Sequence, residues 1–269
     1  MVNPTAIFLP LYMYPINSSW DGVTRKIAEY RDVNFQIVIA PNLINVIPDI
    51  NYLTQLEILN SHRNVQTLGY VPTHWATRDM ALVQEEIDCY ASWANYTDAN
   101  IQVSGIFLDE APSSPSPENL SYMSNVTAYA KSLLSPGKDK ITFNPGVSVD
   151  ATFYDIADEI IIFENTWANF QQNGISPVPP EQQQKSIYLI HNFTAGSRLQ
   201  DDLISNLTDE HVAGAYVTTQ DGYTSMSRLW AGLVDAIDHA GDKLSDDEDD
   251  DDDDEEGGDN DCDNDEERR

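Results

Sequence analysis

Short apolar runs alternate with amphipathic segments from Thr5 to Leu244. Nearly continuous apolar runs are typical of parallel strands that are buried on both faces. The amphipathic segments between them are typical of helices that cross over from one strand to the next. The pattern therefore predicts an α/β protein built from repeated strand and helix units.

Eight strands are predicted, the number that closes a (β/α)8 TIM barrel. They span residues 5–12, 35–41, 65–71, 103–110, 140–146, 159–165, 186–192 and 212–219. Helices are predicted at 20–31, 52–62, 79–95, 117–134, 150–157, 180–185, 199–209 and 225–243, with Asp79, Ser116 and Ser225 as possible caps. The sixth connection, which contains the sequence PVPP, has the weakest helical pattern. An open doubly wound sheet competes with the barrel, but the segment after the first strand lacks the glycine-rich phosphate turn of that fold.

The domain boundary is predicted from a change in composition. Residues 1–244 have the composition of a globular protein and are expected to form one domain, the barrel. Residues 245–269 are rich in Asp and Glu and nearly devoid of apolar side chains. Such a segment buries too little surface to offset the entropy of ordering, so we expect a disordered acidic C-terminal tail.

The chain is strongly acidic, with 45 Asp and Glu against 14 Lys and Arg and a formal net charge of −31. Residues 242–269 carry −15 of this charge and residues 1–241 carry −16, so the domain is acidic in its own right. Such a surface repels nucleic acid and anionic membranes and attracts polycations, although it also serves solubility alone. No apolar stretch reaches the ~18 residues of a membrane span. We therefore expect no nucleic-acid partner and no membrane span.

The cysteines and the glycosylation sequons indicate where the protein is located, inside or outside the cell. Cys89 falls in a predicted helix and Cys262 in the acidic tail. These two positions indicate neither a disulfide framework nor a metal site, and a disulfide between the two cysteines stays open as an alternative. No signal peptide precedes the N-terminal sequence MVNPTAIF, so we interpret the chain as having its mature length. An excess of Asn-x-Ser/Thr sequons favours a secreted eukaryotic glycoprotein. The sequons begin at Asn17, Asn95, Asn119, Asn125, Asn192 and Asn206.

Carboxylates follow the fourth and sixth predicted strands, at the end of the barrel where active sites of this fold lie. The fourth strand ends in GIFLDE, with Asp109 and Glu110, and the sixth in IIIFEN, with Glu164. Alternation along the strand directs Asp109 into the barrel opening and places Glu110 just beyond the strand end. Glycoside hydrolysis typically uses two carboxyl groups that flank the scissile bond, so all three are candidate catalytic residues. A buried ion pair or a loop cap is the alternative for each.

Nine further side chains at strand ends are candidates for substrate binding. Aromatic faces suit stacking on sugar rings, and His and Asn suit hydrogen bonds to hydroxyl or amide groups, whereas packing is the alternative for each. The nine are Tyr12, Tyr14, Tyr70, His74, Trp75, Asn144, Trp167, His191 and Tyr216. No nucleophile elbow, Walker loop or metalloprotease motif occurs, and the five His residues lack the spacing of metal ligands, so we predict no cofactor and no metal.

Six motifs, LPLYMYP, LGYVPTHWATR, GIFLDE, FNPG, IFEN and IHNF, occur in this order along the chain. In this order they resemble the spherulin-4-like family of fungal and slime-mould proteins, over residues 5–240. The resemblance implies a (β/α)8 barrel and an endo-acting glycoside hydrolase for α-1,4-linked N-acetylgalactosamine and galactosamine in galactosaminogalactan. It also implies that Asp109, Glu110 and Glu164 are the functional acidic residues.

We therefore predict a secreted, monomeric endo-α-1,4-N-acetylgalactosaminidase or galactosaminidase whose partner is a galactosamine-containing polysaccharide. Glu110 is assigned as general acid, Asp109 as the group that orients it or stabilises an acetamido group, and Glu164 as the opposing carboxylate. A non-catalytic carbohydrate-binding or spore and cell-wall protein on the same barrel is the alternative, and it has no need for all three carboxylates. A third interpretation, a cation-storage protein, accounts for the acidic tail alone.

Overall fold

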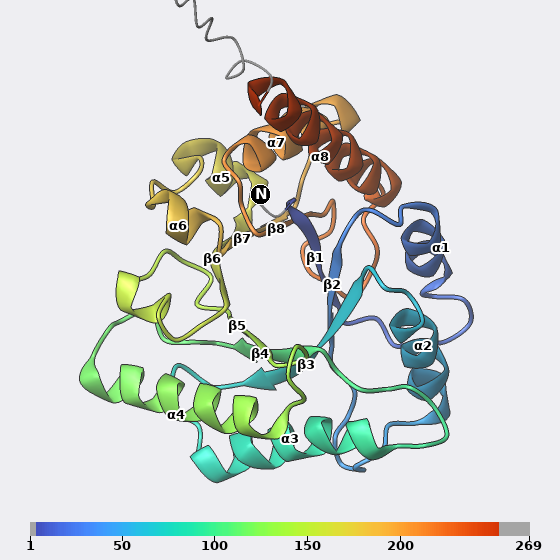
Figure 1. Ribbon diagram of the computed structural model, residues 1–269, viewed down its shortest axis with the longest axis vertical. Coiled ribbons are helices and arrows are strands. Elements are labelled where there is room, and N and C mark those ends of the chain that lie inside the picture. Colours follow the sequence, from blue (N-terminus) through green and yellow to red (C-terminus); the bar gives the residue numbers. More distant parts are fainter. Residues whose placement is uncertain (1–3, 253–269) are drawn as a thin grey trace, which may run out of the picture.

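Eight parallel strands close into a barrel in the computed structural model, which describes residues 4–252 (Figure 1). Each strand pairs with the next along the chain, and β8 returns to pair with β1. The predicted single-domain (β/α)8 barrel is thus confirmed. The strands are β1 (Ala6–Leu11), β2 (Phe35–Ile39), β3 (Val65–Pro72), β4 (Gly105–Asp109), β5 (Lys140–Phe143), β6 (Glu159–Thr166), β7 (Ser186–His191) and β8 (Gly214–Val217).

Helices surround the barrel on the outside (Figure 1). The first and last of them close this outer ring, because Lys26 forms an ion pair with Asp235 at 3.0 Å and the Trp230 indole donates to the Gly22 carbonyl. The α-helices are α1 (Asp21–Glu29), α2 (Ile50–Asn60), α3 (Met80–Ser92), α4 (Pro117–Leu133), α5 (Trp167–Asn173), α6 (Pro180–Gln183), α7 (Ser197–Asp209) and α8 (Trp230–Asp252). Two short 3₁₀ turns are η1 (Trp93–Asn95) and η2 (Ala151–Phe153).

The barrel interior is filled by large side chains. Strands β1 and β2 are buried at every position, which explains their continuous apolar sequences. Inside the barrel, the Phe107 ring lies 5.8 Å from Phe8 and 6.0 Å from Tyr70, centroid to centroid. On the outside, a Cβ at Gly69 would come within 2.7 Å of the Tyr90 ring, so glycine lets α3 pack closely on β3.

Two of the three predicted helix caps are confirmed. The Asp79 carboxylate accepts a hydrogen bond from the Ala81 amide, and the Ser116 hydroxyl accepts one from Asn119. Ser225 is not a cap, because α8 begins only at Trp230. The residues before α8 instead hydrogen-bond back toward the end of β8, and the Arg228 amide donates to the Thr219 hydroxyl.

The chain between β5 and β7 differs most from the sequence prediction. The helix expected at 150–157 is a single 3₁₀ turn, η2, which Asp150 caps through the Thr152 amide. A helix that the sequence did not predict, α5, starts directly after β6, and its cap is Thr166, the last residue of that strand. Gly174, with φ of 67°, ends this helix.

Helix α8 extends to Asp252, beyond the domain boundary predicted at Leu244. Once a helix has formed, each added residue gains a backbone hydrogen bond for the two dihedral angles that it fixes. The disorder predicted for residues 253–269, and with it Cys262, lies outside the described residues. Within residues 4–252, no helix is both long and apolar enough to span a bilayer.

Candidate active site

All eight strands end on the same side of the barrel, which we call the mouth. Asp109 is the last residue of β4, Asn144 follows β5, and Glu164 lies near the end of β6. The Asn144 Nδ2 atom donates hydrogen bonds to Asp109 Oδ1 at 2.8 Å and to Glu164 Oε2 at 2.7 Å. The two carboxylate oxygens are therefore no farther apart than these two bonds laid end to end, about 5.5 Å. Three of the predicted site residues thus lie in direct contact.

Two tyrosines complete the hydrogen bonding of this carboxylate pair. The Tyr70 hydroxyl donates to Asp109 Oδ2 at 2.7 Å, and the Tyr223 hydroxyl donates to Glu164 Oε1 at 2.8 Å. Each of the four carboxylate oxygens therefore accepts a hydrogen bond from an uncharged donor. Hydrogen bonds to charged acceptors are short and strong, so this network fixes both carboxylates in position.

A third tyrosine packs against these two phenols. The Tyr12 ring meets the Tyr70 ring at 5.6 Å and the Tyr223 ring at 5.9 Å, edge to face in both cases. Burial, reinforced by the charges of Asp109 and Glu164, raises the pKa of Tyr12 well above its ordinary value. Burial and the neighbouring carboxylate likewise raise the pKa values of Tyr70 and Tyr223. The phenols are therefore neutral donors over the physiological pH range.

Glu110 stands apart from this network. It follows β4 with φ of 51°, in the left-handed region that few non-glycine residues adopt. Its carbonyl oxygen accepts hydrogen bonds from the Trp75 amide at 2.6 Å and the Thr73 hydroxyl at 2.9 Å, which hold this conformation. Its carboxylate lies 3.5 Å from His74 Nε2, and the side chain is 35% exposed. The Glu110 carboxylate is thus partly exposed beside an imidazole, whereas those of Asp109 and Glu164 are held by amide and phenol donors.

The loop after β3 shares this strained backbone. His74, Trp75 and Ala76 have φ values of 48°, 54° and 65°, a left-handed turn that contacts the Glu110 carbonyl. Clustered backbone strain of this kind is common at functional sites. Trp75 is 61% exposed, so much of its side chain faces solvent.

Two more predicted residues lie at the rim and wall of the mouth. Tyr14 is exposed, its hydroxyl accepts from Asn51 Nδ2, and its ring edge packs on Tyr52. His191 ends β7 and is half-buried. Its Nδ1 atom and the Oδ1 atom of Asn144 are both buried and have no hydrogen-bond partner among the described residues. Two buried polar atoms at the strand ends thus lack a hydrogen-bond partner among the described residues.

Trp167 and Tyr216 were also predicted to bind substrate, but the structure does not expose their rings at the mouth. Trp167 is the first residue of α5 and packs between the rings of Phe170 and Phe193. Tyr216 is 1% exposed, lies beneath Tyr223, and has its pKa raised to about 12 by burial. Both rings are therefore packed inside the protein, the arrangement that the sequence left open as the alternative.

Tyr223 is the site residue that the sequence did not reveal. It lies in the loop between β8 and α8, six residues beyond the last residue of β8, within the sequence QDGYTS. Only residues at or just after strand ends were candidates, and this loop folds back over the mouth from farther away. Within the part of the chain with described side chains, no group of three or more His, Cys, Asp or Glu is arranged to hold a metal ion.

The sequence pattern of the family described as "Spherulation-specific family 4" matches residues 6–237. The chain belongs to this family. Spherulin-4 from Physarum polycephalum is 34% identical over 205 residues, which make up 72% of this chain and 58% of that protein. This member of spherulation-specific family 4 therefore spans little more than half the length of its curated relative.

Among solved structures, Sph3 from Aspergillus clavatus in complex with GalNAc is 29% identical, with a TM-score of 0.79 over 87% of this chain and 98% of that one. A chitinase from Bacteroides thetaiotaomicron has a TM-score of 0.56 at 9% identity, over 88% of this chain and 96% of its own. An endo-1,4-beta-mannanase from Rhizomucor miehei has a TM-score of 0.55 at 8% identity, over 91% and 95%. The last two share the fold alone, whereas Sph3 is a more similar protein whose structure contains bound GalNAc.

Proposed function

We propose that this protein is an endo-acting glycoside hydrolase that cleaves a galactosamine-containing polysaccharide of the galactosaminogalactan type. The observation that carries the proposal is the pair formed by Asp109 and Glu164, bridged by Asn144, with Glu110 following Asp109 in the chain. Glycoside hydrolysis typically needs one carboxyl group to protonate the leaving oxygen and another to act on the opposite side of the sugar. The GalNAc bound to Sph3 supports an amino sugar as the unit recognised.

The contacts of the three carboxylates support a division of roles. Glu110 is the general acid, because its carboxyl is partly exposed and, unlike those of Asp109 and Glu164, is not held by Asn144. Glu164 is the opposing carboxylate, held by Asn144 and Tyr223 where positive charge develops in the transition state. Asp109, anchored by Tyr70 and Asn144, orients the substrate and its nitrogen substituent.

The charge at the mouth favours a partly deacetylated polymer. Three carboxylates meet there, and the described domain is acidic overall. Galactosamine units carry ammonium groups, which such a field attracts and concentrates. We therefore propose that free amino groups strengthen substrate association, whereas the acetylated units are recognised by hydrogen bonds.

The exposed ring of Trp75 also favours a second candidate function, a non-catalytic carbohydrate-binding or cell-wall protein on the same barrel. An aromatic face beside the mouth binds a sugar ring whether or not a bond is cleaved. Such a protein would bind the polymer and release no products.

Replacing Glu164 by Gln separates the two candidates. The substitution keeps the size of the side chain but removes its charge, so hydrolysis of partly deacetylated galactosaminogalactan is expected to fall by at least ~10²-fold. Mass spectrometry of released oligomers measures hydrolysis, and binding of oligosaccharide is expected to persist. Glu57→Gln, on the exposed surface of α2, is the matched control and is expected to retain full activity.

Near-normal hydrolysis by a folded Glu164→Gln variant would refute the proposed mechanism. Polymer binding by the wild-type protein without any release of oligomers would establish the carbohydrate-binding function instead. Thermal unfolding of each variant shows whether it is folded.

We further propose that the protein is secreted and acts as a monomer, since its polymeric substrate lies outside the cell. The exposure of its sequons supports secretion, because an N-linked glycan requires a solvent-facing asparagine. One of the six, Asn119, is half-buried. The other five are exposed, namely Asn17, Asn95, Asn125, Asn192 and Asn206.

A further inference from the structure

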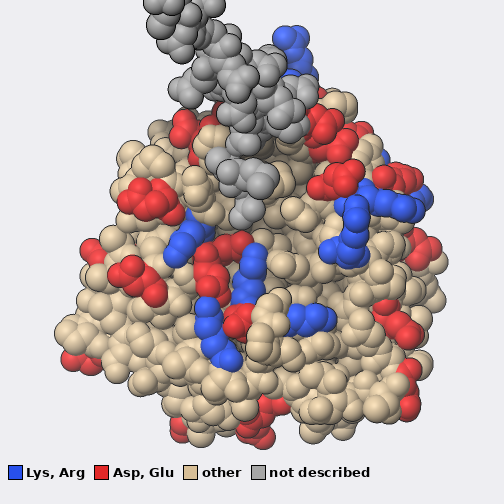
Figure 2. Space-filling model, in the orientation of Figure 1, with Lys and Arg blue, Asp and Glu red and all other residues tan. Residues whose placement is uncertain are grey.

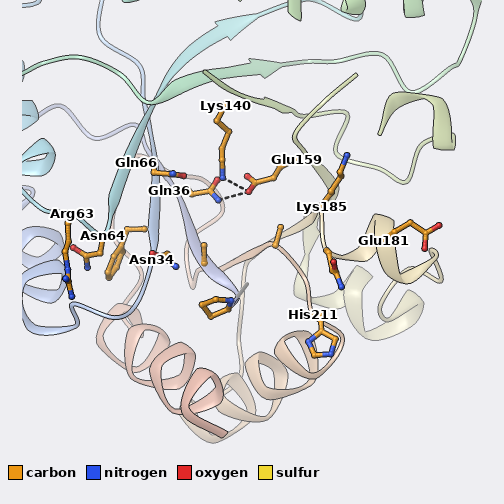
Figure 3. Close-up of a pocket in the computed structure, with 15 residues that line it drawn as sticks. Asn34, Gln36, Arg63, Asn64, Gln66, Lys140, Glu159, Glu181, Lys185 and His211 are labelled. Atoms are coloured by element: carbon orange, nitrogen blue, oxygen red, sulfur yellow. Dashed lines mark hydrogen bonds and ion pairs between the residues drawn. The ribbon is translucent and has the colours of Figure 1, made fainter. Parts of the chain in front are cut away.

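A polar cavity of about 400 Å³ lies at the opposite end of the barrel from the mouth (Figure 3). Its inner wall comes from the first residues of the strands: Gln36 in β2, Gln66 in β3, Lys140 in β5 and Glu159 in β6. Because parallel strands all begin on the same side, these side chains converge on the barrel axis. None of them takes part in the proposed hydrolysis.

Two buried oxygen atoms in this cavity lack a hydrogen-bond donor. Glu159 Oε1 accepts from both Gln36 Nε2, at 2.9 Å, and Lys140 Nζ, at 2.6 Å. Within residues 4–243, whose side chains the structure describes, Glu159 Oε2 and Gln36 Oε1 have no partner, although the two residues are only 9% and 4% exposed. Native structures pair nearly all such buried atoms with protein, water or ligand. The cavity therefore calls for a molecule that donates hydrogen bonds.

The charges around these atoms limit which kinds of molecule can bind in the cavity. The Lys140 ammonium and the Glu159 carboxylate neutralise each other, so the inner wall has no net charge. An anion would face the unpartnered carboxylate oxygen, and a cation would face the ammonium group, so both are disfavoured. A neutral molecule with several hydroxyl groups avoids both conflicts, because each hydroxyl both donates and accepts.

The basic side chains at the cavity rim do not change the net charge of the inner wall. Figure 2 shows Lys and Arg gathered with Asp and Glu near the centre of the face in view, and Arg63 and Lys185 are among the lining residues labelled in Figure 3. Arg63 is highly exposed and pairs with Asp32 at 3.6 Å. Lys185 donates to the Tyr154 carbonyl at 2.8 Å. Lys185 keeps its positive charge, and Glu181, which also lines the cavity, places a negative charge at the same rim, so the inner wall determines which ligand binds.

We propose that this cavity is a second binding site, for a small neutral polyhydroxylated molecule such as a cyclic polyol or a monosaccharide. Its volume lies within the range of roughly 300–1,000 Å³ that is usual for small-molecule sites. The ligand's hydroxyls donate to Glu159 Oε2 and Gln36 Oε1 and accept from the Lys140 ammonium. The site is separate from the mouth and does not depend on the proposed hydrolase function.

Titration of the full chain with myo-inositol, followed by amide chemical shifts in NMR spectra, tests the proposal. Myo-inositol is neutral and is not a fragment of an amino-sugar polymer, so it distinguishes the cavity from the mouth. Saturable shifts are expected at residues 34–36, 63–66, 140 and 159, and not at residues 109, 110, 144 and 164. Inorganic phosphate, titrated in parallel, is expected to leave the cavity residues unshifted.

Substitutions identify the atoms that bind. Gln36→Leu keeps the size of the side chain but removes the acceptor, and is expected to weaken inositol binding about tenfold, equivalent to about 1.4 kcal/mol. Gln102→Leu removes a glutamine that bonds Ser135 outside the cavity, and is expected to leave binding unchanged. If Gln36→Leu fails to fold, the joint change Lys140→Met and Glu159→Gln removes both charges together and is expected to abolish binding.

Three results would overturn the proposal. These are the absence of saturable shifts at the cavity residues, shifts confined to the mouth, and shifts with phosphate but not with inositol. Equal binding by wild type and a folded Gln36→Leu variant would remove Gln36 from the site and contradict the assigned contacts.

Discussion

Asn144 bridges two negatively charged side chains at the mouth. Asp109 and Glu164 repel each other at a separation of about 5.5 Å or less, and this repulsion grows as water is displaced by substrate. The two hydrogens of one amide group are shared between the two carboxylates, and Tyr70 and Tyr223 supply one further donor each. Uncharged donors hold the pair together without cancelling the charge that the proposed reaction uses.

Tyr223→Phe tests how far catalysis depends on this arrangement. The substitution removes only the hydroxyl that donates to Glu164, so the carboxylate loses one of its fixed partners. We expect turnover on galactosaminogalactan to fall by about 10–100-fold, corresponding to the loss of roughly 1.5–3 kcal/mol from one hydrogen bond to a charged group. Substrate affinity is expected to change little. Initial rates at saturating and at low substrate separate the two effects.

Tyr216→Phe is the matched control, because Tyr216 packs beside Tyr223 and is buried without a hydrogen bond to Asp109, Glu110 or Glu164. Its turnover is expected to stay within about twofold of wild type. Equal losses in the two variants would mean that the hydroxyl of Tyr223 acts through packing and not through Glu164.

At the residue scale, the sequence identified the site residues that lie at strand ends and missed Tyr223, which a loop places beside them. Asp109 and Asn144 could be predicted because strand alternation determines where their side chains point. Tyr223 could not, since its position depends on the path of the loop after β8. The burial of Trp167 could not be predicted for a related reason: the strand end it follows runs directly into α5, which turns the ring toward Phe170.

At the scale of single elements, close contact between strands limits which residues can occupy them. Gly105 begins β4, and a Cβ there would lie 2.1 Å from the backbone oxygen of Lys140 on β5. Backbone cannot move aside as a flexible side chain can. The pairing of β4 with β5, which positions Asp109 beside Asn144, therefore requires glycine at this position.

Gly105→Ala is expected to destabilise the protein by about 1–3 kcal/mol or more, the usual cost of overpacking. Gly22→Ala is the matched control, because Gly22 lies in α1 and a Cβ added there would meet no other atom within 4 Å. There alanine lowers the entropy of the unfolded chain and is expected to stabilise by about 0.4–1 kcal/mol. Thermal unfolding measures both changes. Similar effects of the two substitutions would contradict the contact between Gly105 and Lys140.

The strands were easier to predict than the helices for a physical reason. Barrel strands are buried on both faces, so their apolar runs stand out, and all eight were placed within a few residues. Short helices depend on caps and tertiary contacts more than on their own periodicity. Helix α5 was therefore not predicted, because Thr166 both ends a strand and caps the helix. The apolar residues at 150–157 were predicted to form a helix but form one 3₁₀ turn.

At the scale of the whole molecule, the barrel separates two kinds of polar cluster. Carboxylates with uncharged phenol and amide donors occupy the mouth, and a neutralised Lys140–Glu159 pair with glutamines occupies the other end. Between them lies a packed core that includes Phe8 and Phe107. Both clusters lie at strand ends of one closed sheet. The same backbone therefore holds both clusters in position, although they do not contact each other.

The buried tyrosines predict how the stability of the whole protein responds to alkaline pH. Burial raises the pKa of several of them above the ordinary value of about 10, to about 12 for Tyr52 and Tyr216, and it likewise raises the pKa values of Tyr12, Tyr70 and Tyr223. Above pH ~10 the unfolded chain loses phenol protons that the folded protein keeps, so the unfolded state is favoured. Stability is therefore intact below pH ~10 and decreases as the pH rises toward 12 and beyond, by up to about 1.4 kcal/mol per pH unit for each tyrosine.

Thermal unfolding across this pH range, together with phenolate absorbance of the folded protein, checks the prediction. The melting temperature is expected to fall steeply above pH ~10, while part of the tyrosine absorbance change appears only when the protein unfolds. Because lysines also lose their charge in this range, Tyr216→Phe supplies the control, and its stability should fall less steeply than that of wild type. A variant as sensitive to alkali as the wild-type protein, or tyrosines that all ionise near pH ~10 in the folded state, would show that these phenols are not shielded by the barrel.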